Sequence, residues 1–278
     1  MSKVWFITGA GSGIGTGIAK AALRAGDRVV ATGRNLDKVR NAFHDVASDD
    51  LAFVELDVAD EAQANVAVEK AVKQFGRIDV LVNNAGYSLL GNFEEMTAAE
   101  IEHQLATNFW GVAYLMHAVL PVMRKQRSGR IINISSLAGV IGFKHGAAYA
   151  ASKFAVEGLS LSVAAEVDRF GIRLTLVEPG FIRTDLLDGR NVKWPSKSIG
   201  DYADEAKPQE VWSAYDGTQQ GDPDKLGEAI VKIAAMTEPP KQFYAGSDAV
   251  AMIKPALEAR LQEIKDYEEL SKSIDGSF

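Results

Sequence analysis

Short apolar runs alternate with longer stretches of mixed apolar and polar residues along this chain of 278 residues. Short apolar runs between turn residues are typical of strands that are buried on both faces of a sheet. They occur at 4–7, 28–32, 51–56, 80–82, 130–134, 173–177 and 242–245. Helical stretches separate them, which predicts an α/β fold: a doubly wound, parallel, seven-stranded sheet of the Rossmann type.

Cap and turn residues mark the ends of several predicted helices. Thr97 with Glu100 forms a capping box, and Asp222-Pro223 is an N-cap followed by proline at the first helical position. Gly26 and Gly76 follow the last turn of two others. Helices are expected over about 14–25, 35–46 and 61–75, from 97 onward, through Tyr149 to about 170, from 222, and over about 251–272.

Residues 1–278 contain no repeat and no low-complexity tract, so we expect one domain. Two segments depart from the alternation. From about 186 to 221, aromatic residues such as Trp212 and Tyr215 are scattered among polar ones. This segment either covers a substrate as a lid or forms a surface excursion. From about 247 to 278 a charged helical extension ends the chain.

Composition narrows the function classes. The net charge is −7, which disfavours nucleic acid and anionic membranes as partners. The absence of cysteine excludes disulfides, thiolate metal sites and a cysteine nucleophile. The four histidines show no ligand spacing, so no metal is expected. The strand-like start and the lack of an apolar run near ~18 residues favour a cytoplasmic protein without a membrane span.

A glycine-rich turn follows the first apolar run. Thr8-Gly9-Ala10-Gly11-Ser12-Gly13-Ile14-Gly15 lies between a predicted strand and a predicted helix. Glycines let the backbone approach a pyrophosphate, and the helix N-terminus offers unpaired N–H groups. The turn therefore predicts a dinucleotide site. Its spacing, T-G-x-x-x-G-x-G, differs from the G-x-G-x-x-G of the commoner fingerprint.

Tyr149 and Lys153 are four residues apart in a predicted helix, so their side chains share one face. Free tyrosine ionises near pH ~10 and is a poor base at neutral pH unless a fixed cation favours its anion. The Lys153 ammonium can supply that cation. The pair therefore indicates a tyrosine that gives and takes a proton at a substrate oxygen.

Further motifs have the order and spacing of one known family. Asn83-Asn84-Ala85-Gly86 follows the fourth strand, Asp57 follows the third, and Ser136 lies 13 residues before Tyr149. With the glycine turn and the Tyr-Lys pair, they make residues 3 to about 185 resemble a short-chain dehydrogenase/reductase. The resemblance implies hydride transfer between a nicotinamide and a carbonyl or alcohol carbon of a small-molecule substrate.

The resemblance also implies the site residues. Tyr149 would exchange the proton, Ser136 would hold the carbonyl oxygen, Lys153 would favour the tyrosinate, and Asn108 would anchor a water. The implied cofactor contacts are Gly9, Gly11, Ser12, Gly13, Ile14, Gly15, Arg34, Asp57, Val58, Asn84, Ala85, Gly86, Tyr149, Lys153, Pro179, Gly180, Ile182 and Thr184. Leu137, Phe143, His145 and Phe181 are the expected substrate contacts, with His145 facing either substrate or water.

Cofactor choice is indicated at the end of the second strand, which is followed by Gly33 and Arg34 rather than by an acid. A carboxylate there would accept from the ribose hydroxyls of NAD, whereas a guanidinium can pair with the 2′-phosphate of NADP. NADP(H) is therefore expected. NAD(H) stays an alternative, because Arg34 could be a solvated turn residue and Ser12 places no second cation in the glycine loop.

Other functions stay open. A silent NADP(H)-sensing binding protein would keep this fold, although such proteins often lack the tyrosine or lysine. An epimerase or dehydratase is disfavoured, because Ser12 breaks the T-G-x-x-G-x-x-G pattern of that branch. Family members form dimers or tetramers, and we expect a homodimer through the helices of Asn108 and Tyr149 or a homotetramer. The C-terminal extension either alters that interface or caps a monomer.

Overall fold

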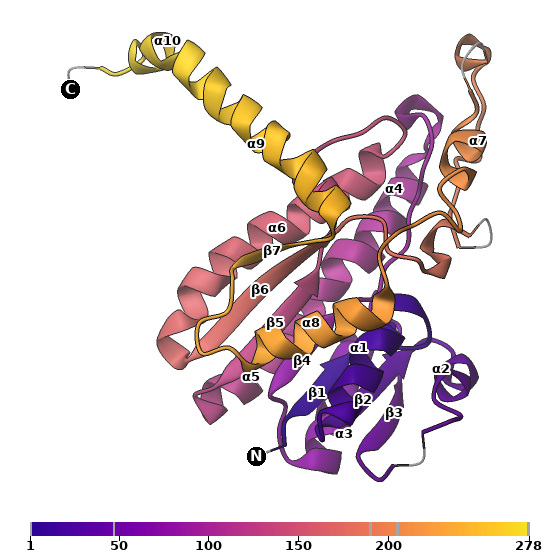
Figure 1. Cartoon of the computed structure of the whole chain (residues 1–278), viewed down its shortest axis with the longest axis vertical. Helices are drawn as coiled ribbons and strands as arrows, with labels where there is room; N and C mark the ends of the chain where they lie inside the picture. Colours follow the sequence, from indigo (N-terminus) through magenta and orange to yellow (C-terminus); the bar gives the residue numbers. More distant parts are fainter. Residues whose placement is uncertain (1, 47, 189–190, 204–205, 277–278) are drawn as a thin grey trace.

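The computed structural model describes residues 2–46, 48–188, 191–203 and 206–276. Within them, seven parallel strands form one sheet in the order β3-β2-β1-β4-β5-β6-β7 (Figure 1). The order reverses between β1 and β4, which confirms the doubly wound fold. The strands are β1 (Val4–Ile7), β2 (Arg28–Gly33), β3 (Leu51–Glu55), β4 (Val80–Asn83), β5 (Gly129–Ile134), β6 (Ile172–Pro179) and β7 (Gln242–Ala245).

Helices cover both faces of the sheet. One core layer contains buried residues of α3, α5 and α6, and the opposite layer contains buried residues of α1, α2 and α8. The helices are α1 (Gly13–Arg24), α2 (Leu36–Ala42), α3 (Glu61–Phe75), α4 (Ala98–Leu105), α5 (Gly111–Gln126), α6 (Ala147–Val167), α7 (Pro208–Ser213), α8 (Pro223–Ala235), α9 (Ser247–Asp266) and α10 (Glu268–Lys272).

Two predicted helix boundaries differ from those of the structure. The second helix ends at Ala42 rather than near residue 46, because the Phe43 ring turns into the core and packs on Phe53 with 6.0 Å between centroids. The C-terminal helix starts at Ser247, four residues early. There the Asp248 carboxylate accepts the backbone N–H of Phe181 at 2.6 Å, so a contact distant in sequence fixes where the helix begins.

A π-helical turn, η2 (Ala106–Trp110), joins α4 to α5 without a break. The continuous helix Ala98–Gln126 is long and apolar enough to cross a membrane by length and composition alone, and the core helix of a doubly wound domain has the same character. Leu115, Val119 and Met123 are fully buried in the core beneath the sheet. These side chains are therefore already covered within the domain.

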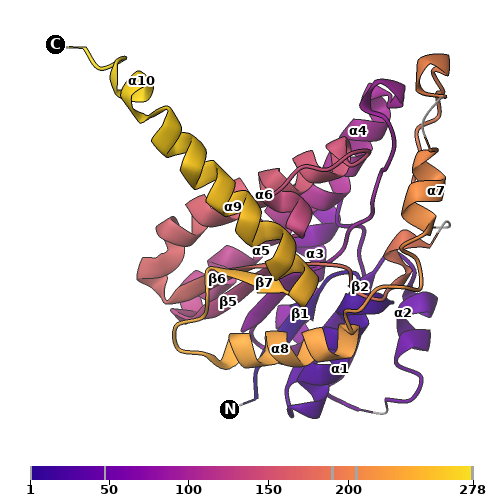
Figure 2. The ribbon, with the colours of Figure 1, turned by 45° about the horizontal axis from the view of Figure 1, so that its top comes forward.

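The two segments that depart from the alternation of strands and helices, about 186–221 and 247–278, lie on different sides of the molecule (Figures 1 and 2). The segment that contains η5 (Asp185–Leu187), η6 (Gly200–Tyr202) and α7 rises beside α4. Two isolated bridges hold its ends, Leu89 with Lys193 and Ile182 with Gly221. α9 and α10 project from the opposite side, away from the sheet.

Candidate active site

A cavity of about 990 Å³ opens at the carboxyl edge of the sheet. Residues that follow six strands line it: Gly9 after β1, Arg34 after β2, Asp57 after β3, Asn84 after β4, Ser136 after β5 and Gly180 after β6. Ligands of open α/β sheets bind where strand order reverses, outside the carboxyl ends. The fold thus brings most of the predicted site residues together around one cavity.

The glycine turn is shaped for close approach of its backbone. Gly9 and Gly13 have φ values of 65° and 55°, in the region that favours glycine. A Cβ on Gly15 would lie 2.4 Å from the carbonyl oxygen of Gly9, so Gly15 lets α1 start directly against the turn. The Asn84 amide donates to the carbonyls of Thr8 at 2.9 Å and Gly9 at 3.2 Å, which fixes the turn to β4.

Most of the expected cofactor contacts line the cavity. They are Gly9, Ser12, Gly13, Ile14, Arg34, Asp57, Val58, Asn84, Ala85, Gly86, Tyr149, Lys153, Pro179, Gly180, Ile182 and Thr184. Gly11 and Gly15 do not line it. Both glycines instead make room for neighbours, since a Cβ on Gly11 would lie 3.3 Å from Cγ2 of Val39.

Two cations lie at the β2 side of the cavity. Arg34 follows β2 directly, and Lys38 comes one helical turn later on α2; both side chains are exposed and line the cavity. Lys38 lies over the glycine turn, where a Cβ on Gly11 would be 3.5 Å from its Cγ. The sequence analysis missed Lys38, because Arg34 precedes α2 and no helical spacing relates the two residues.

Tyr149 and Lys153 lie on one face of α6, with the Lys153 ammonium 5.8 Å from the centroid of the Tyr149 ring. Both are buried and line the cavity. Burial raises the pKa of Tyr149, and a hydrogen bond with the Ser136 side chain opposes the rise. Burial lowers the pKa of Lys153 to about 8, and the Glu157 carboxylate opposes this fall. Burial therefore keeps the Tyr149 phenol protonated at neutral pH and brings the pKa of Lys153 closer to neutral than that of a free lysine.

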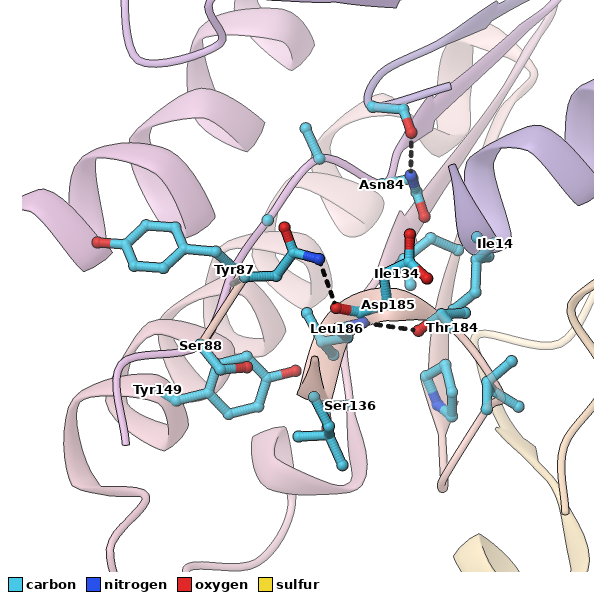
Figure 3. A pocket seen from close by; sticks show the side chains of 18 of the residues that line it. Ile14, Asn84, Tyr87, Ser88, Ile134, Ser136, Tyr149, Thr184, Asp185 and Leu186 are labelled. Carbon is cyan, nitrogen blue, oxygen red and sulfur yellow. Dashed lines mark hydrogen bonds between the residues drawn. The ribbon is translucent and has the colours of Figure 1, made fainter. Parts of the chain in front are cut away.

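Ser136 follows β5 by two residues and caps the short η3 turn (Leu137–Gly139), with its Oγ accepting the N–H of Ala138 at 3.1 Å. Figure 3 shows its side chain beside the Tyr149 phenol. The neighbouring Ser135 also lines the cavity, but it is 3% exposed and its side chain hydrogen-bonds Glu157. The choice of Ser136 as the serine of the site stays a prediction.

Asn108 lies in the π turn and is 1% exposed. Its Nδ2 donates to the carbonyl of Tyr87 at 3.0 Å and to Ser152 Oγ at 3.2 Å, and its Oδ1 accepts the N–H of Tyr87 at 3.1 Å. Single π turns within α-helices often occur at functional sites. Asn108 does not line the cavity, so its contact with the site is through the backbone of Tyr87 and through α6.

Two buried carboxyl groups lie behind Lys153, and the sequence analysis did not find them. Glu157 follows Lys153 by one turn of α6, and Glu178 on β6 is fully buried. The Gln242 amide donates to both, at 3.4 Å to Glu157 and 3.2 Å to Glu178. Burial raises the pKa of both carboxyls, that of Glu178 to about 8, and the Glu157 charge adds to the rise at Glu178. The i,i+4 spacing of Lys153 and Glu157 was the available signal.

Leu137, Phe143 and Phe181 line the cavity as expected for substrate contacts. His145 does not: it is 9% exposed, has a φ of 66°, and its carbonyl accepts the N–H of Gly91 at 2.8 Å. The left-handed backbone at His145 turns the chain into α6 and takes the side chain out of the cavity lining. The segment that was expected to be either a lid or a surface excursion also contributes to the lining, through residues that were not assigned as substrate contacts, among them Leu187, Val211, Trp212, Tyr215 and Gln219.

Curated relatives match along nearly the whole chain. Residues 3–193 match the family described as short chain dehydrogenase. "Oxidoreductase BOA17" of Botryotinia fuckeliana is 38% identical over 98% of this chain and 98% of its own. "3-ketodihydrosphingosine reductase" of Bacteroides thetaiotaomicron is 40% identical over 88% of each chain.

Solved structures of similar proteins have the same fold as this chain. A short-chain dehydrogenase from Streptomyces avermitilis superposes with a TM-score of 0.91, at 36% identity over 99% of this chain and 100% of its own. ElxO with NADP bound has a TM-score of 0.73, at 32% identity over 87% and 96%. A Burkholderia phymatum protein in complex with NAD, 23% identical over 97% and 95% with a TM-score of 0.78, shares the fold. This chain is an oxidoreductase of the short-chain dehydrogenase family.

Proposed function

We propose that this protein is an NADP(H)-dependent oxidoreductase that interconverts a carbonyl group and an alcohol, with Tyr149 as general acid and base. The observation that carries the proposal is the placing of Tyr149, Lys153 and Ser136 together on the wall of one cavity. The name of the relative from Bacteroides thetaiotaomicron, a keto-compound reductase, supports carbonyl reduction as the reaction.

The residues around the glycine turn fit a dinucleotide. No side chain caps the start of α1, and its first turn carries no acid, so its N–H groups are free for an anionic pyrophosphate. The turn, Asp57, the 84–86 segment and the 179–184 segment would hold the cofactor. When bound, a reduced nicotinamide supplies the hydride for the carbonyl carbon.

The protein's own side chains would transfer the proton to the substrate oxygen. Ser136 holds the substrate oxygen beside the Tyr149 phenol, which is protonated at neutral pH because burial raises its pKa. Tyr149 gives that proton to the oxygen as negative charge develops there. The Lys153 ammonium stabilises the tyrosinate that remains. Lys153 Nζ donates to the carbonyl of Ile134 at 2.8 Å, which keeps the ammonium in place.

Substitution of Tyr149 tests the reaction. We expect Tyr149→Phe to lower the rate of ketone reduction by about 10²- to 10⁴-fold, because the ring stays and only the proton donor is lost. NADPH oxidation is followed with ketones, aldehydes, quinones and keto esters. Tight NADPH binding to both proteins without turnover of any carbonyl compound would instead favour the sensing binding protein.

We propose that Arg34 and Lys38 give the preference for NADP(H), as their charges suit a 2′-phosphate. The NADP bound to the related ElxO supports this proposal. Arg34→Ala should weaken NADPH binding by about 10- to 100-fold and leave NADH binding nearly unchanged, since a charge-assisted pair is lost only with NADPH. Lys20→Ala, which removes a cation paired with Asp45 outside the cavity, is the matched control. Equal losses for both cofactors would contradict the assignment.

A further inference from the structure

Ser88 follows the Asn83-Asn84-Ala85-Gly86 turn by two residues and lines the cavity. Its side chain has no hydrogen bond with any of the described residues. Ser88 is 2% exposed, but its Oγ is not one of the unpaired atoms that are closed off from solvent, as Nε1 of Trp212 is. Ser88 therefore presents a free hydroxyl to the cavity.

The backbone on both sides of Ser88 is held in place. Gln104 is fully buried, and its side chain accepts the N–H of Leu89 at 2.6 Å and donates to the carbonyl of Tyr87 at 3.0 Å. The carbonyl of Ser88 itself accepts the N–H of Lys193 at 2.8 Å. Because these contacts fix the chain before and after Ser88, its hydroxyl is positioned before a ligand binds.

Ser88 lies close to the proton donor of the proposed reaction. Figure 3 shows its side chain beside Tyr149. The two residues that follow Ser88 pack on the start of α6: Leu89 shares a buried cluster with Ala148, and Leu90 shares one with Tyr149. A substrate whose carbonyl oxygen meets Tyr149 would therefore have its nearest atoms at Ser88.

The Ser88 hydroxyl is in excess of what the carbonyl oxygen requires. A carbonyl oxygen has two lone pairs, and in the proposed reaction the hydroxyls of Tyr149 and Ser136 occupy both. Ser88 is therefore left for a second polar atom of the substrate. Leu90 and Leu137 also line the cavity, so an apolar group that covered Ser88 would leave its hydroxyl without a partner, which is unfavourable.

We propose, resting on the reductase function above, that Ser88 determines specificity by selecting ketones with a hydroxyl group on the carbon next to the carbonyl. A serine hydroxyl both donates and accepts, so it can pair with such a group in either sense. The reaction itself is unchanged. The carbonyl carbon gains a hydride with two electrons from NADPH, which becomes NADP⁺, and the oxygen gains a proton from Tyr149. Ser88 exchanges no proton, and the product is a vicinal diol.

Two ketones of equal chain length test this contact: 1-hydroxy-2-decanone and 3-undecanone, in which a methyl group replaces the hydroxyl. The hydroxyl also activates the carbonyl beside it, so the readout is how the ratio of the two kcat/KM values differs between wild-type protein and Ser88→Ala. The substitution should lower this ratio by about three- to tenfold, the effect of one hydrogen bond, and should not slow the reduction of 3-undecanone.

Ser160→Ala is the matched control. Ser160 is also a buried serine, but its hydroxyl accepts from Asn133 at 2.8 Å and does not line the cavity. Any effect of this change on the fold lowers both rates by one factor and leaves their ratio unchanged. The same behaviour in Ser88→Ala would overturn the proposal, because Ser88 would then serve the fold, the cofactor or the reacting oxygen and would not distinguish the two ketones.

Binding separates this proposal from the proposed reaction. Dissociation constants of both ketones are measured by calorimetry on Tyr149→Phe, with and without Ser88→Ala, in the presence of NADP⁺, where no reduction occurs. If the wild-type protein reduces neither ketone but Ser88→Ala weakens binding of the hydroxyketone alone, the reaction is wrong and the contact stands. If both ketones are reduced but Ser88→Ala changes the two affinities equally or not at all, the reaction stands and the contact is wrong.

Discussion

Lys153 has two kinds of neighbour. On one side lies the Tyr149 phenol, and on the other lie the buried carboxyl groups of Glu157 and Glu178. Burial disfavours charge on both Glu157 and Glu178, and the two carboxyls share the single amide group of Gln242. The pKa of Glu178 is raised to about 8, so this carboxyl keeps its proton at neutral pH, and a negative charge on Glu157 raises the pKa of the neighbouring Lys153. Tyr244 is a further titratable neighbour of the two carboxyls, and burial raises its pKa as well.

Glu157→Gln tests this arrangement. The Glu157 charge raises the pKa of Lys153 against burial, so its removal should lower that pKa further below the present value of about 8. If reduction requires the Lys153 ammonium, the rate is complete below this pKa and is lost as pH rises through it. We therefore expect the alkaline limb of the pH–rate profile to move to lower pH, with a rate loss of about tenfold at pH 9 for each unit of movement.

Glu166→Gln is the matched control, because Glu166 lies exposed on the same helix and its substitution should leave the profile in place. A Glu157→Gln profile that is lower at every pH by one factor would contradict the electrostatic role. That outcome would assign Glu157 to packing against Ser135 and Gly139.

The residues of the site differ in how far the sequence could predict them. Tyr149 and Lys153 could be predicted because one helix turn sets their spacing, and Ser136 followed from the interval that the family resemblance implies. Glu157 could have been found by the same i,i+4 argument from Lys153, whereas Lys38 gave no such signal because Arg34 lies outside the helix. Glu178 and Gln242 could not have been predicted. The sequence does not show the register between β6 and β7, and this register decides which polar side chains of the two strands meet.

At the scale of elements, α1 and α8 meet through two glycines. A Cβ on Gly17 would lie 2.4 Å from the carbonyl oxygen of Pro223, and one on Gly227 would lie 2.5 Å from that of Gly17. Both obstructions are backbone atoms, which cannot move aside as side chains do. The closeness of the two helices holds α1, and hence the glycine turn before it, against the sheet.

Gly227→Ala should therefore destabilise the protein by about 1–3 kcal/mol, as an overpacked contact does. The comparison is Gly158→Ala on α6, where a Cβ would meet no heavy atom within 4 Å. This change should stabilise by about 0.5–1 kcal/mol, because alanine loses less backbone entropy in a helix. Chemical denaturation of both variants measures the difference. Two changes of the same sign would show that helix propensity and not the crossing of α1 and α8 sets the effect.

The elements of the sheet could be predicted from the sequence because strands buried on both faces must be apolar throughout. The capping box at Thr97 is also present, with the Thr97 side chain accepting from Glu100 and the Glu100 carboxylate accepting in return. The π turn at Asn108 could not be predicted, because its extra residue does not alter the helical pattern on either side. α7 was missed because it is only six residues long within a polar segment.

At the scale of the whole molecule, the extension after Ile253 leaves apolar side chains in water. Ile264 is 66% exposed, Leu270 67% and Ile274 84%. By contrast Ile253 is 1% exposed and packs with Leu137 and Val140, close in the chain to Ser136. Exposed apolar residues also occur on α6, including Phe154 at 41%. Association of two copies through α6 stays a prediction. The extension itself has a first part that packs on the domain at Ile253 and a second part, with Ile264 to Ile274, whose apolar side chains are exposed.

Deletion of residues 263–278 should change the melting temperature by less than about 2 °C, because the side chains of residues 263–276 are all exposed. Ile253→Ala should instead cost about 2–5 kcal/mol, as a fully buried isoleucine is lost. Calorimetry at several protein concentrations measures both variants beside the full chain. A deletion that lowers the melting temperature by more than about 5 °C, with the loss growing as concentration rises, would show that another copy covers the exposed second part. In that case light scattering should show a smaller assembly for the shortened chain.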